Sequence, residues 1–578
     1  MRKENDLQIR PGRIRSQSAQ RVRPFIAQAL ASAQKAGATV RKGRITTKRS
    51  TFGRGRQASI AANRLLTSRS RLVVVKARFV KHRNHASPLK AHLRYLQREG
   101  VTKDGDKGVL FSADRDGVDG AEFADRCADD RHHFRFIVSP EDAVELADLQ
   151  QFTRDLMRQA EADLGTPLDW VAVSHWNTEH PHVHILVRGV TDIGDDLVIN
   201  RDYIREGLRA RAQSLITEEL GPRTDADVHR ALHRQVDAER FTQLDRQLLA
   251  DTKRDGFVDL APSATQPPGQ FQVLKAGRLR KLEALGLADQ FAPGQWVISE
   301  RAETALRELG ERGDIIKRIH RGLTEASVDR AMQAYDLGGD AHSTPVVGRL
   351  IARGLDDELK GTAYLIIDGV DGRTRHVALP SLEATGDSPA GSIVTLQVRA
   401  EDPDARVTVR VESDFDLQSQ IHASGATWLD RQLVKGDRQE IADSGFGAEV
   451  QAAIGRRIDH LVMEGLAERN DSAVTVQRGL LETLRQRELQ QTAKQLAAAN
   501  TRPVTLPVEG EHVAGVYRRR LDLASGRFAV LDDGLGFQLV PWTPKIDPHL
   551  GQAISGSMRT RTAVTWDIGR SKSIGIEM

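Results

Sequence analysis

Runs of alternating and β-branched apolar residues predict four strands in the first half of the chain. RLVVVKARFVKH at 71–82 and HHFRFIVSP at 132–140 are two of them. DWVAVSHW at 169–176 and HVHILVRG at 182–189 follow each other so closely that we expect an antiparallel hairpin.

Three other stretches have the apolar spacing of helices. SPLKAHLRYLQREG at 87–100 can be capped by Ser87, and its final Gly100 is a typical helix terminus. The second helix is expected at 141–165 and the third at 201–221. Strands with interposed helices and one hairpin are typical of an α+β fold in which helices flank an antiparallel sheet.

The C-terminal half contains a weak internal repeat. RLRKLEALGLA at 278–288 resembles RIDHLVMEGLA at 457–467, and each is followed by a short β-like piece and a helix. The β-rich stretches 346–380 and 513–541 then share Gly, Asp-Gly and a final Pro in step. We therefore predict two copies of a winged-helix-like module followed by a small β-barrel-like module. Neither copy has a catalytic constellation, so a binding role is expected.

These patterns predict the following division of the chain. The parts are a basic flexible arm (1–69), the α+β domain (70–221), a charged and then Pro/Ser/Thr-rich linker (222–270), a winged-helix-like module (271–340), a small β module (341–412), a second winged-helix-like module (413–500), and a second β module with the C-terminal tail (501–578).

Charge changes this picture at the N-terminal end. Residues 1–90 contain 23 Lys and Arg but only two acids, while the whole chain has a net charge of +5. A polycationic arm indicates a polyanionic partner, most often nucleic acid, although a solvated tail is the alternative. No apolar run approaches the roughly 20 residues of a membrane span. The single Cys127 excludes an internal disulfide and a Cys-based zinc site. A cytoplasmic protein without membrane insertion is expected.

The stretch HWNTEHPHVHILVRG (175–189) is the main candidate for chemistry. Strand alternation places His182 and His184 on one face, and a hairpin can bring His175 level with them. Three imidazoles can then converge on one divalent cation and leave coordination positions open, which is the catalytic pattern of ligation. A polar loop with solvated histidines is the alternative.

A second alternative is a histidine-triad nucleotide hydrolase. His180, His182 and His184 alternate in a way that resembles the signature of those enzymes. Pro181 interrupts the strand ladder on which that signature depends, and His175 is left without a role.

Tyr95 is the candidate nucleophile among five tyrosines. It lies in the predicted helix after the first strand, where Lys90, Arg94 and Arg98 form a basic stripe at i, i+4 and i+8. Nearby cations favour the phenolate, and a metal-bound phosphate is more electrophilic. Without the histidines, Tyr95 is better explained as an ordinary packing residue of an amphipathic helix.

Together, the two segments resemble the conjugative relaxases of the HUH endonuclease superfamily, in particular the mobilisation class that includes the T-DNA relaxase. The tyrosine motif of that class is matched by Leu93, Tyr95, Leu96 and Arg98, and its motif H-x-D/N-x-x-H-P-H-x-H by His175, Asn177, His180, Pro181, His182 and His184. The C-terminal tail resembles a region of uncharacterised function attached to some of these relaxases.

The resemblance implies roles for individual residues. His175, His182 and His184 would hold a divalent metal ion, with Mg²⁺ or Mn²⁺ expected. Tyr95 would form a 5′-phosphotyrosyl bond, and Ser139 would touch DNA near the nick. The family often has an Asp in the histidine motif; here Asn177 or Glu179 must serve, with Glu179 taken as catalytic, and His180 is an extra candidate. The basic stripe of Lys90, Arg94 and Arg98 is expected to contact DNA.

The resemblance also implies partners. They are single-stranded and transfer-origin DNA, relaxosome accessory proteins and a type IV secretion coupling protein. A relaxase would work in the bacterial cytoplasm and be carried with its strand into the recipient cell. The remaining alternative is a DNA-binding regulator or replication-type initiator without nicking activity.

Deleting residues 1–70 tests the basic arm. If the arm binds phosphate, the deletion flattens the plot of log affinity for DNA against log salt concentration, because fewer counterions are released on binding. An unchanged slope in a salt titration would refute that role.

Overall fold

The structure, a computed structural model, describes most of the chain. The described stretches are 38–41, 44–47, 70–82, 89–98, 100–176, 181–261, 270–337, 345–398, 407–436, 441–470 and 473–567. Two compact units divide the chain, Met1–Gly310 and Glu311–Met578. Among the described residues, no helix combines the length and the apolar character needed to cross a membrane.

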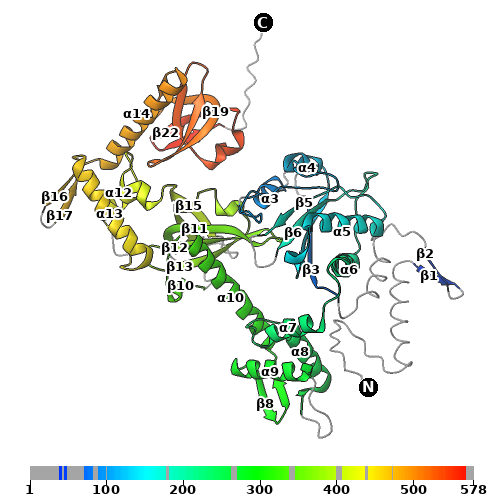
Figure 1. The fold of residues 1–578 in the computed structure, drawn as a ribbon. Coiled ribbons are helices and arrows are strands. Elements are labelled where there is room, and N and C mark those ends of the chain that lie inside the picture. Colours follow the sequence, from blue (N-terminus) through cyan, green and yellow to red (C-terminus); the bar gives the residue numbers. More distant parts are fainter. Residues whose placement is uncertain are drawn as a thin grey trace. The chain divides into compact units, whose positions relative to one another are not determined.

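A four-stranded antiparallel sheet organises the first unit (Figure 1). Its strands, in spatial order, are β3 (Val73–Lys81), β4 (His132–Pro140), β6 (His182–Arg188) and β5 (Trp170–His175). The predicted α+β class with an antiparallel sheet is confirmed, and so is the predicted hairpin, which is formed by β5 and β6.

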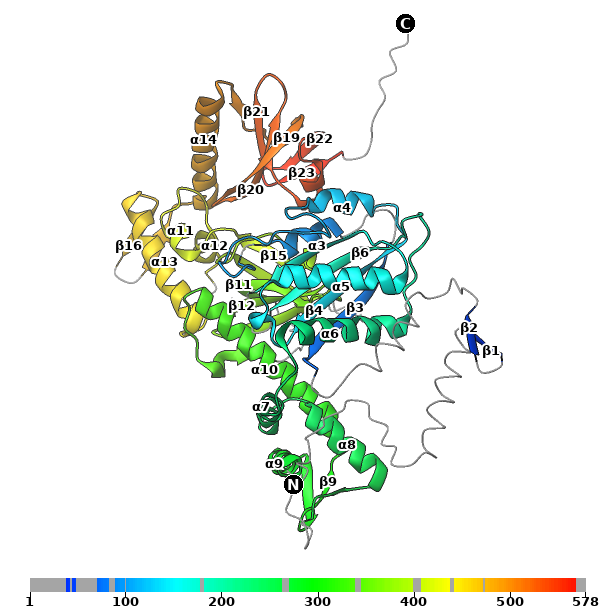
Figure 2. The same cartoon turned by 45° about the vertical axis from the view of Figure 1, so that its right-hand side comes forward.

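One face of the sheet packs against α5 (Leu149–Leu164) and α6 (Leu208–Leu220), as Figure 2 shows. Alternate residues of β6 point into this apolar core, namely Val183, Ile185 and Val187. A single π-helical turn, η3 (Tyr203–Gly207), leads into α6.

The other face packs against α3 (Leu89–Leu96) and α4 (Gly120–Arg126). A second apolar core forms there from Leu89, Leu93 and Leu96 of α3, Phe123 and Ala124 of α4, and Val171, Val173 and Leu186 of the sheet. The two-residue alternation of β5 and β6 therefore divides their apolar residues between two cores.

The predicted helix 141–165 is correct at its end and wrong at its start. Helix α5 begins after Asp148, whose carboxylate accepts the backbone N–H groups of Gln150 and Gln151, as an N-cap does. It ends at Gly165, where φ is +66°, a conformation that suits glycine. Between residues 141 and 148, where the helix was predicted to begin, the structure has the short 3-10 turn η2 (Ala143–Glu145).

The segment 222–270 is not the linker that its charged composition predicts. It contains α7 (Asp225–Val236), α8 (Gln243–Asp255) and β7 (Val258–Asp259). Both helices begin with a capping box, in which a Thr and the Asp three residues later bond each other's backbone N–H. The solvent-facing sides of the helices carry the charges, while buried leucines lie on the inner sides.

The first unit continues with α9 (Gln270–Ala284) and the hairpin of β8 (Ala288–Ala292) and β9 (Gln295–Ile298). These two strands form a three-stranded sheet with β7. Helix α10 (Ala302–Glu325) follows and contains the boundary between the units. In the predicted arm 1–69, β1 (Ala38–Arg41) pairs with β2 (Arg44–Thr47), and the rest of the arm lies outside the described residues.

The second unit contains two six-stranded sheets with helices between them. The first part comprises η4 (Met332–Ala334), β10 (Tyr335–Asp336), β11 (Val346–Asp357), β12 (Thr362–Gly369), β13 (Thr374–Leu379), η5 (Glu383–Thr385), β14 (Ile393–Val398) and β15 (Val407–Ser413). The helical part comprises α11 (Leu417–Ile421), α12 (Trp428–Lys435), α13 (Gly445–Met463), the hairpin β16 (Ala467–Asn470) and β17 (Ala473–Val476), and α14 (Leu480–Asn500). The last part comprises β18 (Val504–Thr505), β19 (His512–Leu523), β20 (Gly526–Asp532), β21 (Phe537–Pro541), η6 (Pro544–His549), β22 (Ala553–Thr560) and β23 (Ala563–Trp566).

The two sheets have the same strand order. The order is β10-β13-β12-β11-β14-β15 in one and β18-β21-β20-β19-β22-β23 in the other, with a parallel pair at the same edge of each. The long strands β11 and β19 occupy the same position in the two sheets, and each has a β-bulge, after Leu350 in β11 and after Tyr517 in β19. The winged-helix and barrel descriptions of the modules stay predictions.

A fully buried arginine occupies the same place in both helical parts. Arg278 of α9 bonds Asp245 at 2.7 and 2.9 Å and also donates to backbone carbonyls of the α7–α8 connection. Arg457 of α13 bonds Asp430 at 2.9 Å through two nitrogens and donates to carbonyls of the α11–α12 connection. Each Asp is also the capping-box residue of its helix. In each helical part, the arginine guanidinium is hydrogen-bonded to groups of two other helices, and the aspartate compensates its buried charge.

Replacing Asp430 by Asn leaves the Arg457 guanidinium buried without a counter-charge. We expect a loss of about 3–5 kcal/mol in local stability, measured by hydrogen exchange of α12 and α13 amides in the full chain. Asp459→Asn is the matched control, because its ion pair with Arg469 on the same module is half exposed and is worth about 0–1 kcal/mol. Equal losses in the two variants would contradict the role assigned to the buried pair.

Candidate metal centre and active site

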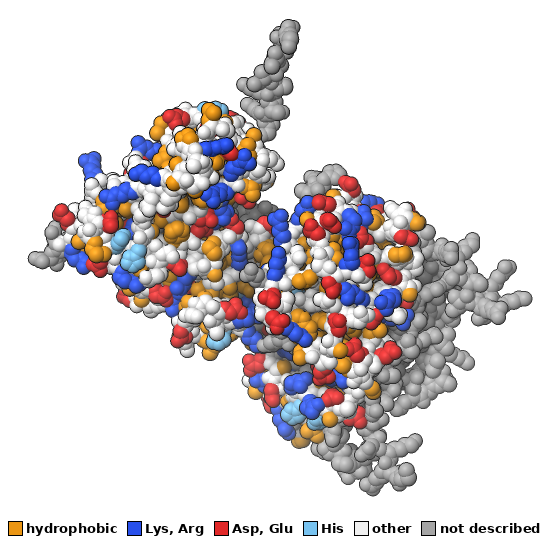
Figure 3. Space-filling view, turned by 45° about the horizontal axis from the view of Figure 1, so that its top comes forward, with side chains coloured by type: hydrophobic (Ala, Val, Ile, Leu, Met, Phe, Trp, Pro, Cys, Tyr) orange, Lys and Arg blue, Asp and Glu red, His pale blue; other side chains and the backbone are white. Residues whose placement is uncertain are grey.

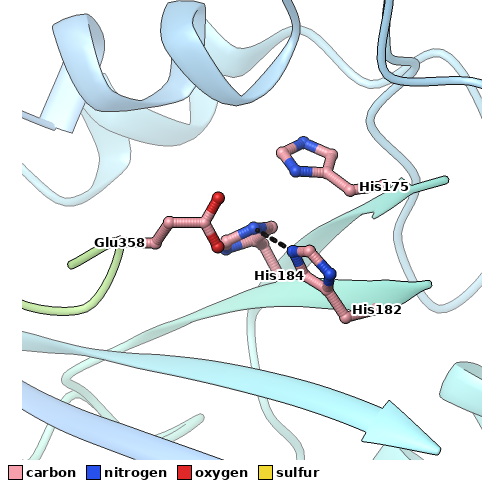
Figure 4. Close-up of side chains that lie close together, drawn as sticks. All are labelled: His175, His182, His184 and Glu358. Carbon is pink, nitrogen blue, oxygen red and sulfur yellow. Dashed lines mark hydrogen bonds between the residues drawn. The ribbon is translucent and has the colours of Figure 1, made fainter. Parts of the chain in front are cut away.

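The register of the β5–β6 hairpin places three histidines side by side. His175 lies directly opposite His182, and Val173 lies opposite His184. Residues opposite each other in an antiparallel pair project from the same face. The predicted convergence of His175 with His182 and His184 is therefore confirmed, as Figure 4 shows. Their candidate ligand nitrogens all lie within 4.8 Å of one another.

The hydrogen bonds of His175 leave one nitrogen for a metal ion. Its Nε2 lies 2.8 Å from the carbonyl oxygen of Leu96, which can only accept, so Nε2 carries the proton. The buried Nδ1 has no hydrogen-bond partner within the described part of the chain. Burial, helped by neighbouring His184 and Arg98, lowers the pKa of His175 to about 2. The imidazole is therefore neutral, which is the form that binds metals.

His182 and His184 complete a donor set that suits a divalent cation. Their Nε2 atoms face each other at 3.1 Å, and both rings are buried. Three clustered imidazoles, of which the neutral His175 has a buried Nδ1 without a hydrogen-bond partner in the described part of the chain, fit a catalytic metal site. The Leu96 carbonyl acts as the outer partner that orients His175. Glu358, also drawn in Figure 4, belongs to the second unit, and the site is built from the first unit alone.

Ser139 lies on the histidine face of β4. Ile137, two residues earlier, is paired with His184, so Ser139 projects from the same side near His182. Its hydroxyl donates to the carbonyl of Pro181 at 3.3 Å. The structure thus brings Ser139 to the candidate metal centre, and its contact with DNA stays a prediction.

Tyr95 lies on the helix that the histidine site holds in place. The carbonyl that accepts from His175 belongs to Leu96, the next residue of α3. Tyr95 is half-buried against the core below α3, and the Arg98 guanidinium lies 4.2 Å from the centre of its ring. Helix α3, which carries Tyr95, therefore lies against the β5–β6 hairpin that carries the histidines.

The predicted basic stripe is only partly available to DNA. Lys90 forms an exposed ion pair with Asp125 of α4 at 2.6 Å, and Arg98 stacks on Tyr95. Arg94 is exposed. The predictions for Asn177, Glu179 and His180 lie outside the described residues.

A second polar cluster on β3 and β4 escaped the sequence analysis. Arg135 donates through Nε to His133 Nε2 at 2.9 Å, so the His133 proton is on Nδ1, which faces His82 Nε2 at 2.6 Å. Burial, with Arg135 and His82 nearby, lowers the pKa of His133 to about 2. The only sequence signal was a histidine and an arginine two residues apart in an otherwise apolar strand.

On one face of the molecule, surface charge does not single out a nucleic-acid site. On the face shown in Figure 3, described Lys and Arg side chains are interspersed with Asp and Glu.

Family comparison places this site in a class of nuclease. Residues 112–216 match the family described as "Relaxase: MobA/VirD2-like, nuclease domain". The match contains β4, β5 and β6 with the three histidines and Ser139, and it begins after the helix that carries Tyr95. This match supports a relaxase-type nuclease domain of the HUH class, a class that acts on DNA, in this part of the chain.

The C-terminal half belongs to a second family. Residues 275–406 and 399–575, together more than half of the chain, match the family described as "Protein of unknown function (DUF3363)". The chain is a member of that family, and the expectation of an uncharacterised C-terminal region is confirmed. No curated protein and no solved structure matches the chain.

Replacing His182 by Ala tests the metal centre directly. We expect the affinity of the full chain for Mn²⁺, measured by calorimetry, to fall at least about tenfold, because one of three ligands is lost. His512→Ala, an exposed histidine of β19, is the control and should bind like the unaltered protein. Equal Mn²⁺ affinity in the two variants would exclude the histidine centre.

Proposed function

We propose that this chain is a site- and strand-specific relaxase. It nicks single-stranded DNA at the transfer origin of a plasmid or integrative element and later rejoins the strand. The observation that carries the proposal is the convergence of three buried histidines, one with an orphaned Nδ1, inside the matched relaxase segment.

His175, His182 and His184 are the residues that would hold a divalent ion, with Mg²⁺ or Mn²⁺ expected. When bound, such an ion supplies Lewis-acid polarisation of a phosphoryl oxygen. The Leu96 carbonyl keeps the His175 proton on Nε2, so that Nδ1 stays available to the ion. The apolar cores on both faces of the hairpin hold the rings in place.

Tyr95 is the proposed nucleophile. Its phenolic oxygen attacks the scissile phosphorus, the Oη–P bond forms, and the bond between phosphorus and the 3′ oxygen breaks. The phenol loses its proton, and the leaving oxygen takes one up as a 3′-hydroxyl. Arg98, whose guanidinium lies against the ring, favours the phenolate. One phosphodiester replaces another, so the reverse attack by a 3′-hydroxyl can rejoin the strand.

The C-terminal half has a binding role in this proposal. Two copies of a winged-helix-like and a small β-barrel-like module would hold the duplex beside the nicked strand, and the repeated strand order supports the duplication. The relaxase would act with accessory proteins in the bacterial cytoplasm, engage a type IV coupling protein, and travel with its strand into the recipient.

A covalent-adduct assay tests this function. The full chain is incubated with Mn²⁺ and single-stranded oligonucleotides tiled across the DNA around its own gene, and then denatured. We expect a covalent protein–DNA adduct that Tyr95→Phe abolishes, because the nucleophilic oxygen is gone. Tyr335→Phe, the same change in the second unit, should leave adduct formation unaltered.

Other outcomes identify the competing functions. An adduct that persists in Tyr95→Phe excludes Tyr95 as the nucleophile. Sequence-specific binding without any adduct indicates a regulator or initiator whose nuclease site is idle. Nucleotide hydrolysis that is lost in His182→Ala would indicate a histidine-triad hydrolase.

A further inference from the structure

Strands β3 and β4 carry basic side chains and no acidic ones. Their sequences, VVVKARFVK and HHFRFIVSP, contain Lys76, Arg78, Lys81 and Arg135. The two strands form the half of the sheet that includes the outer strand β3, and β4 lies next to the histidine-bearing strand β6 (Figure 2). Two adjacent strands without any carboxylate concentrate positive charge at one place on the sheet.

The strand register shows which of these cations share the histidine face. Ile137 is paired with His184 on one side and with Lys76 on the other. Arg135, two residues from Ile137, is paired with Arg78. Lys76, Arg78 and Arg135 therefore project from the histidine face. Arg135 is a diagonal neighbour of His184, at roughly 7–8 Å across the two strands.

The described helices on the histidine face, α3 and α4, pack on β5 and β6 and not on β3. The apolar core of α3 and α4 is formed with Val171, Val173 and Leu186, all of them on β5 and β6. On β3, Lys76 and Arg78 are exposed. Cations two residues apart on a strand are spaced by about 6.8 Å, so they form a row that can contact successive groups of an extended polyanion.

Arg135 is buried and is oriented by His133, which lies two residues earlier on the same face of β4. Its Nε–H donates to His133, and His133 in turn faces His82. One edge of the guanidinium is thus committed to the protein. Its planar fork presents donors in a geometry that matches phosphate oxygens.

We propose that Lys76, Arg78 and Arg135 form a phosphate strip, a row of cations that holds single-stranded DNA beside the scissile phosphate. The strip rests on the proposed function, since it continues the histidine site toward the outer strand of the sheet. The occupant is a single strand, because a flexible backbone can lie across the sheet and bring one phosphate to the histidines and the next ones to the cations. Such contacts are insensitive to sequence and sensitive to salt.

The salt dependence of DNA binding tests the phosphate strip. The full chain in EDTA, so that no strand is cleaved, is titrated into a fluorescein-labelled oligothymidylate of about 20 nucleotides, longer than a single-module site. Fluorescence anisotropy is recorded at several salt concentrations. In the double variant Lys76→Gln, Arg78→Gln, we expect the slope of log affinity against log salt to fall in magnitude by about 1.4, because each lost phosphate contact removes about 0.7.

Lys81→Gln is the matched control. Lys81 is an exposed cation on the same strand, but it pairs with His132 and projects from the opposite face. Its variant should keep the slope of the unaltered protein. The proposal is overturned if the double variant keeps that slope, or if Lys81→Gln loses as much per residue as the double variant does.

Arg135→Gln extends the test to the residue nearest the histidines. We expect a further decrease of about 0.7 in the slope, with thermal unfolding used to check that the buried substitution still folds. Should Arg135→Gln fail to fold, the exposed pair on β3 still decides the matter.

The two proposals fail in different ways. Binding in EDTA does not require the chemical step, so a reduced slope without any Tyr95 adduct would leave the phosphate strip standing and remove the nicking function. A Tyr95-dependent adduct with unchanged slopes would leave the nicking function standing and remove the phosphate strip.

Discussion

The antiparallel register of β5 and β6 is the constraint on which the candidate site depends. Because His175 is paired with His182, all three histidines share one face and the apolar residues between them share the other. A slip of one residue would turn the histidines of one strand toward α5 and α6 and turn apolar residues toward the candidate metal centre. Both faces of the hairpin pack against apolar cores, so such a slip would place imidazole rings inside the apolar core under α5 and α6. The same packing that stabilises the hairpin therefore specifies the ligand geometry.

The helix of Tyr95 is tied to this hairpin by two different forces. Leucines of α3 pack on Val171 and Val173, and the His175 ring donates to the Leu96 carbonyl near the helix end. The hydrogen bond satisfies a carbonyl that the short helix leaves open, and it also sets the tautomer of a metal ligand. One contact thus joins the nucleophile helix and the candidate metal centre, two segments about 80 residues apart in the chain.

Buried cations occur throughout the protein, and each has partners that suit its place. Arg278 and Arg457 are saturated by an aspartate and by backbone carbonyls, which is the arrangement expected of a structural group. Arg135, which is also buried, donates through Nε to His133, and this contact orients its guanidinium.

Local periodicity in the sequence was enough to predict the strands, the parity of His182 and His184, and the end of α5 at Gly165, because neighbouring residues determine each of these. The repeated Arg of RLRKLEALGLA and RIDHLVMEGLA was visible too, but its burial was not. The helices in 222–270 were missed because their charged outer faces conceal short apolar stripes. Three features depend on which strand or helix lies beside which. They are the ion pair of Lys90 with Asp125, the contact of His133 with His82, and the position of Lys76 on the histidine face. Sequence alone determined which face each residue takes within its own element. Only the tertiary structure decided which faces meet, because register and packing are set by cores assembled from distant parts of the chain.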